Sequence, residues 1–243
     1  MSVGVRAGSG PDDDGRRRYW LLDADHAVIG TITVDTWQRG WSCLGVSSLA
    51  VRPAARGAGV ARQALESVYD AAVASGLNGA QLHTHWAWQP TVRWYLRREM
   101  WVTSWKHDLG LSRVRHLPPY EVTRVRQGFA FSVEEGGVRE PLLIAGRKGD
   151  VLRLRQAEAY RRRARQGGRH DSTLFYAGTT FALHLALAGW PLVRGAAEWE
   201  AAPESSDIGQ PEGLARKIQL FEESARRDGW SVCTPSLVLP AFD

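Results

Sequence analysis

Cysteine and long apolar runs are scarce in this sequence. The two cysteines, Cys43 and Cys233, lie far apart, which excludes a disulfide framework and a cysteine zinc site and favours a reducing compartment. The most apolar stretch, residues 181–193, is interrupted by a histidine, a glycine and a proline and is too short to span a bilayer. The first fifteen residues contain no apolar run that could act as a signal peptide. We therefore expect a cytoplasmic protein without a membrane partner.

Lysine is also scarce, because only Lys106, Lys148 and Lys217 occur among 31 basic residues and the other 28 are arginine. The net charge is +5, and arginine binds phosphate well, so a phosphate-bearing partner is one interpretation. A coding bias toward arginine and alanine explains the same composition without any function. The length of 243 residues and the 44% hydrophobic share allow a real core and exclude a largely disordered chain.

The N-terminal half reads as alternating strands and helices after a flexible lead-in over residues 1–17. Apolar runs predict strands, and apolar residues at three- and four-residue spacing predict helices. The expected strands are 19–23, 28–35, 43–51, 80–86 and 101–111, and the expected helices run from the glycines at 57–59 to about Gly76 and from Pro90 to about Met100.

The C-terminal region follows a seam at Leu117–Pro119, where two prolines stop regular structure. We expect strands at 129–133, 141–145 and 151–154, helices at 156–166, 173–189 and 212–228, and an acidic loop over Glu198–Pro211. The arginine-rich stretch 151–169 is interpreted as a solvated face that pairs with the acidic residues of Glu198–Glu212, and this is preferred to nucleic-acid binding. His170-Asp171-Ser172 carries the residue types of a catalytic triad, but neighbours in sequence seldom form one.

The segment LAVRPAARGAGVARQAL, residues 49–65, predicts an anion site where a strand turns into a helix. Gly57 and Gly59 leave the backbone bare, and the first helical N–H groups have no partners within the helix. These groups and the helix dipole favour a pyrophosphate, with Arg56 and Arg62 adding charge at the rim. The segment lacks the Gly-Lys-Ser/Thr of a Walker loop and the three glycines of a dinucleotide fold. Taken alone, such a turn can also be purely structural.

The loop and the elements around it, over residues 18–112, resemble the GNAT N-acetyltransferase superfamily. The coenzyme A loop of that family reads Arg/Gln-x-x-Gly-x-Gly/Ala, and Arg56, Gly59 and Ala61 fill it in register. The stretch Leu49-Ala50-Val51-x-Pro53 is similar to the end of the family's central strand. Val92-Arg93-Trp94-Tyr95 resembles its apolar-x-aromatic-Tyr segment.

The resemblance implies an α+β fold with a splayed mixed sheet and flanking helices, and an acetyl-CoA site in the splay. The backbone N–H groups of Gly57, Ala58, Gly59, Val60 and Ala61, with Arg62 beside them, would hold the pyrophosphate. The backbone of Leu49, Ala50 and Val51 would pair with the pantetheine arm. The implied activity is N-acetyl transfer to an amine that attacks the thioester directly, with Tyr95 as the acid that protonates the departing thiolate.

Two departures from the family pattern concern the acceptor side. The family often places a carboxylate just before the cofactor loop, whereas this chain has Ser47 and Ser48 there, which leaves a water relay through either serine or an imidazole from His83 or His85. The two histidines share a face and also fit a metal pair, but we find no third ligand and expect no metal. The usual N-terminal strand and two helices also have no place in so short a lead-in. The acceptor side is therefore absent, supplied by a partner subunit, or rebuilt by residues 113–243, which we prefer.

These observations leave two functions from different classes, and the identity of the amine stays open. The domains expected are a flexible segment 1–17, a GNAT-like acetyl-CoA-binding domain 18–112, and an α+β region 113–243 in which we recognise no family. The preferred function is an acetyl-CoA-dependent N-acetyltransferase. The alternative is a non-catalytic acyl-CoA-binding or regulatory protein with a degenerate acceptor site. The tryptophans at 86, 88, 94, 101 and 105 favour a core role over an acceptor pocket, and a homo-oligomer is left open.

Overall fold

The structure is a computed structural model, and its described residues form two compact units. It describes residues 4–7, 16–35, 42–85, 88–105, 108–148, 151–167 and 171–189. The first unit contains the described residues up to His83, and the second begins at Thr84. The expected acidic loop Glu198–Pro211, the expected helix 212–228 and His170 lie outside the described residues.

The first unit is built on a mixed sheet whose strand order is β1-β2-β3-β4-β5. The strands are β1 Gly4–Ala7, β2 Arg16–Leu22, β3 Val28–Asp35, β4 Cys43–Val51 and β5 Gly79–Thr84. Neighbouring strands from β1 to β4 are antiparallel, whereas β4 and β5 are parallel. The turn between β2 and β3 is held by the Asp23 carboxylate, which accepts hydrogen bonds from the N–H groups of Asp25 and Ala27.

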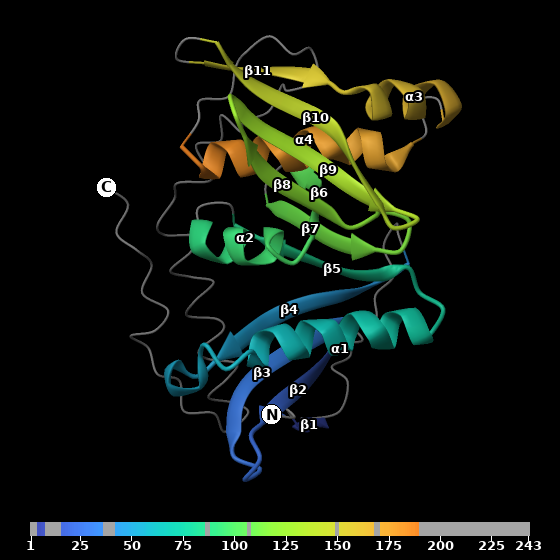
Figure 1. The fold of residues 1–243 in the computed structure, drawn as a ribbon. Helices are drawn as coiled ribbons and strands as arrows, with labels where there is room; N and C mark the ends of the chain where they lie inside the picture. The colour runs from blue at the N-terminus through green and yellow to red at the C-terminus, as the bar shows by residue number, and fades with distance from the viewer. Residues whose placement is uncertain are drawn as a thin grey trace. The chain divides into compact units, whose positions relative to one another are not determined.

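Helix α1, Val60–Ala74, packs against β3 and β4 and supplies the parallel crossover from β4 to β5 (Figure 1). Apolar residues at helical spacing predicted this helix. Its buried residues have that spacing and are Val60, Ala64, Leu65, Val68 and Ala72. A short turn of 3-10 helix, Pro53–Ala55, lies between β4 and α1. The helix ends at a left-handed glycine, Gly76, with φ +81°, and the N–H of Leu77 returns to the carbonyl of Ala72 at 2.9 Å.

The start of the chain differs from the expectation of a flexible lead-in. Strand β1 lies there and pairs with β2 in the register Gly4↔Leu22 to Ala7↔Tyr19. Only residues 8–15 separate β1 from β2, which is too short for two helices. The first unit therefore has an N-terminal strand without room for the two helices that the family usually places after it.

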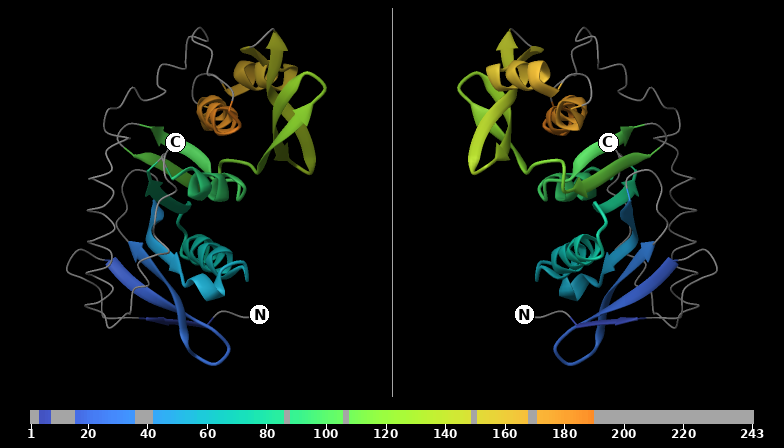
Figure 2. Two further views of the ribbon diagram at one scale, coloured as in Figure 1. Left: turned by 90° about the vertical axis from the view of Figure 1, so that its left-hand side faces the viewer. Right: turned by 90° about the vertical axis from the view of Figure 1, so that its right-hand side faces the viewer.

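The second unit begins with helix α2, Gln89–Leu96, and the strand pair β6 Trp101–Trp105 and β7 Leu109–Val114. An antiparallel sheet of four strands follows in sequence order: β8 Tyr120–Val125, β9 Gly128–Glu135, β10 Val138–Lys148 and β11 Val151–Gln156. The helices are α3 Glu158–Gly167 and α4 Ser172–Leu187. Helix α4 contacts β6 and β10, and Figure 2 shows it against one face of the four-stranded sheet.

An aromatic cluster joins β6 to the sheet that follows it. The ring of Trp101 packs edge-on against Tyr120 at 5.0 Å and Phe131 at 5.4 Å, and Phe131 contacts Phe181 of α4 at 5.7 Å. The Trp101 indole N–H also donates to the carbonyl of Pro118 at 3.1 Å. Trp101 is thus a core residue, as the sequence favoured. Because β6 shares this core, the unit boundary falls between His83 and Thr84, whereas the sequence suggested a seam at Leu117–Pro119.

One strand prediction in this unit is wrong, and one strand was not predicted at all. The run 101–111 was expected as one strand, but β6 ends at Trp105 and β7 begins at Leu109 on the opposite side of a hairpin. Strand β8 was missed, because only Tyr120 of its six residues is buried and two of the others are charged, which leaves no clear apolar alternation in the sequence.

Within the described part of the chain, no helix is both long and apolar enough to cross a membrane.

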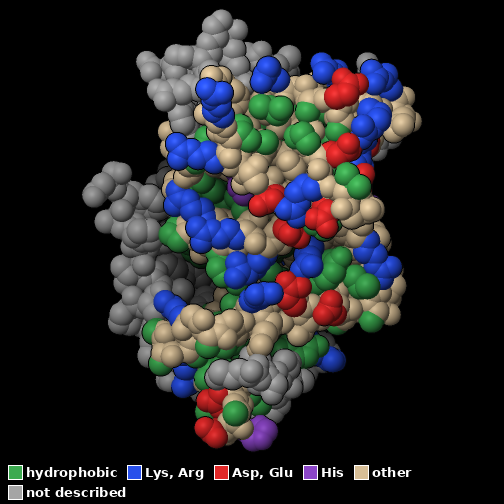
Figure 3. Space-filling model, viewed as in Figure 1, with side chains coloured by type: hydrophobic (Ala, Val, Ile, Leu, Met, Phe, Trp, Pro, Cys, Tyr) green, Lys and Arg blue, Asp and Glu red, His purple; other side chains and the backbone are tan. Residues whose placement is uncertain are grey.

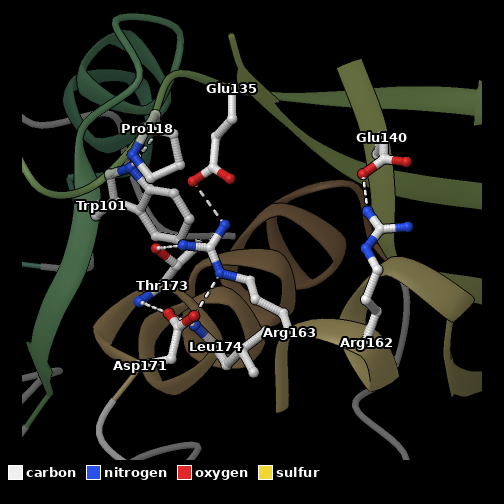
Figure 4. A network of polar contacts seen from close by, with 9 residues as sticks. All are labelled: Trp101, Pro118, Glu135, Glu140, Arg162, Arg163, Asp171, Thr173 and Leu174. Atoms are coloured by element: carbon white, nitrogen blue, oxygen red, sulfur yellow. Dashed lines mark hydrogen bonds and ion pairs between the residues drawn. The ribbon is translucent and has the colours of Figure 1, made fainter. Parts of the chain in front are cut away.

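The N-terminus of α4 is held by an ion-pair network centred on Arg163 (Figure 4). The Asp171 carboxylate caps the helix by accepting the N–H of Thr173 at 2.9 Å and that of Leu174 at 3.3 Å. The Arg163 guanidinium pairs with Asp171 and, at 2.6 Å, with Glu135 of β9. Asp171 therefore has a structural role as a helix cap.

Candidate functional site

The loop before α1 leaves its backbone donors without partners inside the helix. Gly57 and Gly59 both take left-handed φ angles, +83° and +82°. Gly59 is the N-cap, no side chain caps the helix, and its first turn contains no acidic residue. The first helical hydrogen bond runs from the N–H of Gln63 to the carbonyl of Gly59 at 2.9 Å. The N–H groups of the three residues between them therefore have no acceptor within the helix.

The two glycines are required by their backbone conformation rather than by crowding. A Cβ atom added at Gly57 or Gly59 would meet nothing within 4 Å, so the space before the helix is open to a ligand. Any other L-residue at these φ angles would be strained. The loop is tied to the preceding strand by Arg56, whose Nε donates to the carbonyl of Val51 at 3.1 Å. Arg56 and Arg62 are both exposed beside the loop.

Strand β4 separates from β5 at the position that leads to this loop. The parallel pairing runs only from Cys43↔Gly79 to Val46↔Leu82. From Ser47 onward, β4 keeps its partner β3 but has no ladder partner on its other side among the described residues. A free strand edge thus runs over Leu49–Val51 toward the glycine loop, as in the splayed sheet that the family resemblance implies.

A β-bulge lies at the point where the strands separate. The pairing with β3 changes from Thr33↔Ser47 to Thr31↔Ala50, so β4 carries one extra residue there. Ser48 takes a φ of +50°, a left-handed conformation that costs a non-glycine residue about 1–2 kcal/mol. Ser47 and Ser48 are both exposed, so the bulge turns two hydroxyl-bearing residues to solvent.

The nearest carboxylate in the register of these strands is Asp35, which the sequence analysis did not consider. It lies directly opposite Gly45, two residues along the ladder from the pair Thr33↔Ser47, and forms an ion pair with Arg16 at 3.6 Å. Only cross-strand pairing brings it toward the serines, and spacing along the chain could not reveal that. His83 is exposed on β5, and no group of three metal-binding side chains occurs among the described residues.

Tyr95 belongs to the second unit, where α2 places it on the buried side of the helix. Only 8% of the residue is exposed, and burial raises its pKa to about 12. Its ring packs edge-on against Trp94 at 5.1 Å. Its hydroxyl makes no hydrogen bond to any residue that the structure describes. Tyr95 is therefore a neutral phenol whose hydroxyl donates no hydrogen bond to a described residue.

Tyr120 shows what a structural tyrosine looks like in the same unit, and sequence reasoning missed it. Its hydroxyl lies 3.2 Å from the carbonyl of Leu96, 3.0 Å from that of Met100, and 3.2 Å from Nε2 of His184. Complete burial raises its pKa, and Glu99 adds to the shift. Burial lowers the pKa of His184 to about 4, so this imidazole is neutral at physiological pH. Tyr120 thus serves the fold around α2.

The chain takes a left-handed conformation after α2, which glycine favours, although the residue there is Glu99. The helix ends at Leu96, and Glu99 takes a left-handed φ of +58°. The guanidinium of Arg98 lies 3.7 Å from the centre of the Trp94 ring and donates to the Trp94 carbonyl at 2.7 Å. These contacts brace the turn at which the sequence departs from the family pattern.

The arginines of α3 pair with acids of their own unit. Arg161 and Arg165 contact Glu158 at 3.1 and 3.0 Å, and Arg162 pairs with Glu140 of β10. Figure 3 shows basic and acidic side chains interspersed over this part of the surface. The solvated face expected from the sequence is therefore present, whereas the partners expected for it, Glu198–Glu212, lie outside the described residues.

A family model matches the N-terminal part of the chain. The model of the Acetyltransferase (GNAT) family matches residues 7–100, which is less than half of the chain. No curated protein matches the sequence significantly.

Solved structures that resemble part of the chain include one putative acyltransferase and two acetyltransferases. A putative acyl-CoA N-acyltransferase from Klebsiella pneumoniae is 8% identical, with a TM-score of 0.39 over 46% of this chain and 97% of that one. A GNAT family acetyltransferase from Elizabethkingia anophelis with acetyl-CoA bound is 11% identical, with a TM-score of 0.39 over 46% and 98%. A nourseothricin acetyltransferase is 22% identical, with a TM-score of 0.37 over 43% and 68%.

Proposed function

Because residues 7–100 match the GNAT acetyltransferase family, we propose that this protein moves an acetyl group from acetyl-CoA to an amine by direct attack on the thioester. The observation that carries the proposal is the N-terminus of α1. There a glycine N-cap at φ +82° leaves helical N–H groups without a side-chain cap, at the end of a short loop that follows a strand with a free edge. A helix end of this kind binds a pyrophosphate well.

The described residues fit acetyl-CoA at both of its binding parts. The N–H groups from Gly57 to Arg62 would hold the pyrophosphate, because the space before the glycines is open and no acidic side chain occupies the first turn. The backbone of Leu49–Val51 would pair with the pantetheine arm as an added strand, because this edge of β4 has no ladder partner among the described residues. When bound, acetyl-CoA supplies an acetyl group activated as a thioester.

Tyr95 acts as the general acid in this proposal. A phenol with a pKa of about 12 stays protonated at physiological pH, and the Tyr95 hydroxyl has no competing acceptor among the described residues. It would donate its proton to the departing thiolate. The burial that raises the pKa also makes the Tyr95 phenol a weaker acid. Proton donation is therefore favoured only when negative charge develops on the sulfur of the leaving thiolate.

Ser47 and Ser48 would hold the water that receives the proton of the attacking amine. Both are exposed at the bulge, where the strand edge becomes free, and neither carries a charge that would attract the ammonium form. A water relay suits such hydroxyls, because serine both donates and accepts hydrogen bonds.

The proposal is tested by measuring acetyl-CoA binding by calorimetry and free thiol release with a panel of amines. We expect binding by the wild-type chain, thiol release with at least one amine, and release about 100-fold slower in Tyr95→Phe, as is usual for a lost general acid. Tyr176→Phe, a half-buried tyrosine of α4, is the matched control and should keep the wild-type rate. Absence of acetyl-CoA binding would overturn the proposal.

The alternative of a non-catalytic acyl-CoA-binding protein rests on one observation. No carboxylate accompanies the serines of the bulge in the described part of β4. This alternative predicts binding of acetyl-CoA without thiol release for any amine and an unchanged affinity in Tyr95→Phe. The same two measurements therefore separate an enzyme from a sensor.

A further inference from the structure

Helix α4 holds the helix that carries Tyr95 by a contact at its own C-terminal end. The guanidinium of Arg93 on α2 donates a hydrogen bond to the carbonyl of Leu187, the last residue of α4. The last carbonyls of a helix lack partners within it and carry its partial negative charge, so a cation there is favourable. Arg93 also lies within 3.5 Å of the Gln89 side chain, which keeps the guanidinium on this side of α2.

A second contact one helical turn away is made through Tyr120. Its hydroxyl has one proton to donate, and it faces the carbonyls of Leu96 and Met100 at 3.2 and 3.0 Å. The third neighbour is Nε2 of His184 on α4 at 3.2 Å, and which of the two atoms donates depends on the tautomer of the imidazole. Burial lowers the pKa of His184 to about 4, so the ring that meets the phenol is neutral at physiological pH.

The two contacts are in register and give the helices their direction. Arg93 of α2 meets Leu187 of α4, and three residues later Leu96 meets His184 through the Tyr120 hydroxyl, three residues earlier on α4. The two helices are therefore antiparallel where they meet, and each is held over one turn. Tyr95 lies between the two held positions of α2.

We propose that Tyr120, supported by His184, is a positioning residue that fixes the last turn of α2 and with it the orientation of the Tyr95 hydroxyl. This inference rests on the proposed function, since it concerns the acid of that reaction. Tyr120 touches no reacting atom in it. The region after residue 112 then takes part in acetyl transfer by holding the catalytic helix, in addition to its own packing.

The first test does not depend on activity, because it measures amide hydrogen exchange in α2. Tyr120→Phe keeps the ring in its aromatic cluster and removes only the hydroxyl, so exchange of the amides at residues 97–99 should rise about 10-fold. The matched control is Thr180→Val, which removes another buried hydrogen bond of α4, from the N–H of Val102 at 3.0 Å, without touching α2. Equal exchange at these amides in both variants and the wild type would overturn the inference.

The second test is a double-mutant cycle on thiol release. Tyr120→Phe should lower kcat about 5–10-fold with KM for acetyl-CoA unchanged, as expected for a misplaced acid. Combined with Tyr95→Phe, it should be no slower than Tyr95→Phe alone, because the two residues act through one group. Factors that multiply in the double variant would overturn the inference. If the wild-type chain releases no thiol with any amine, the proposed function fails, and the exchange experiment still decides the role of Tyr120.

Discussion

Replacing Gly59 by glutamate is expected to weaken acetyl-CoA binding by about 100-fold while leaving the fold intact. A Cβ at this position meets nothing within 4 Å, so the side chain fits without a clash. Its carboxylate would point into the space before α1, where the proposed pyrophosphate lies. Two like charges about 5 Å apart repel by about 3 kcal/mol at an effective dielectric constant of 20, which weakens binding by about 100-fold.

Gly76→Glu is the matched control at the other end of the same helix. Gly76 has nearly the same φ, +81°, and the same open space around a Cβ, so both substitutions cost about 1–2 kcal/mol in backbone strain. The helix dipole then separates them, because a carboxylate is favourable at the N-terminus and unfavourable at the C-terminus by about 0.5 kcal/mol each. Gly76→Glu should therefore be the less stable variant by about 1 kcal/mol, yet bind acetyl-CoA normally.

Urea unfolding measures the stability order of the two variants, and calorimetry measures their affinities. The expected result is that the more stable variant, Gly59→Glu, is the one that binds acetyl-CoA about 100-fold more weakly. Wild-type affinity in Gly59→Glu would refute the placement of the pyrophosphate at α1. Equal loss of affinity in both variants would refute it as well, because the effect would then follow from damage to the helix.

Three further predictions concern the second unit. The rate of thiol release should show no fall assignable to Tyr95 below pH 11, because burial raises its pKa to about 12; a fall near pH 10 that is absent in Tyr95→Phe would contradict this. Burial lowers the pKa of His184 to about 4, so the folded state prefers the neutral ring. The folded state therefore has its full stability above pH 6.5 and loses stability as the pH falls toward 4, because only the unfolded state takes up the proton in this range. In urea titrations, His184→Gln should remove about 3 kcal/mol of this loss of unfolding free energy. Arg163→Met leaves the largely buried Asp171 unpaired and should cost about 2 kcal/mol in unfolding free energy, whereas Arg162→Met at an exposed pair should cost less than about 0.5 kcal/mol.

Much of the first unit could be predicted from the sequence, because its signals are local. The spacing of apolar residues predicted α1, and the run 43–51 predicted β4 with the bounds that the structure has. The pair Gly57 and Gly59 marked the turn into this helix, and both glycines take left-handed φ angles in the structure. The roles of the loop residues, Ser47 and Ser48, and Tyr95 remain proposals.

The features that the sequence could not reveal depend on pairs of residues far apart in the chain. Asp35 comes opposite Gly45 only through strand register. The hydroxyl of Tyr120 meets His184 across 64 residues, and no spacing rule predicts such a contact. Helix α2 was expected to continue to about Met100, but the left-handed Glu99 follows its earlier end at Leu96, although glutamate favours helices. Tertiary packing overrides the local preference there.

The aromatic cluster around Trp101 determines where this chain can be cut. The segment that matches the GNAT family ends at residue 100, and the next residue is only 1% exposed because Tyr120 and Phe131 cover it. Burying a tryptophan removes about 200 Å² from water, which contributes about 5 kcal/mol. A fragment truncated near residue 112 would present that surface to solvent and lose this contribution. Expression trials, domain swaps and crystallisation fragments that follow the family boundary should therefore yield aggregated protein, and the strands β8 and β9 belong in any shortened version.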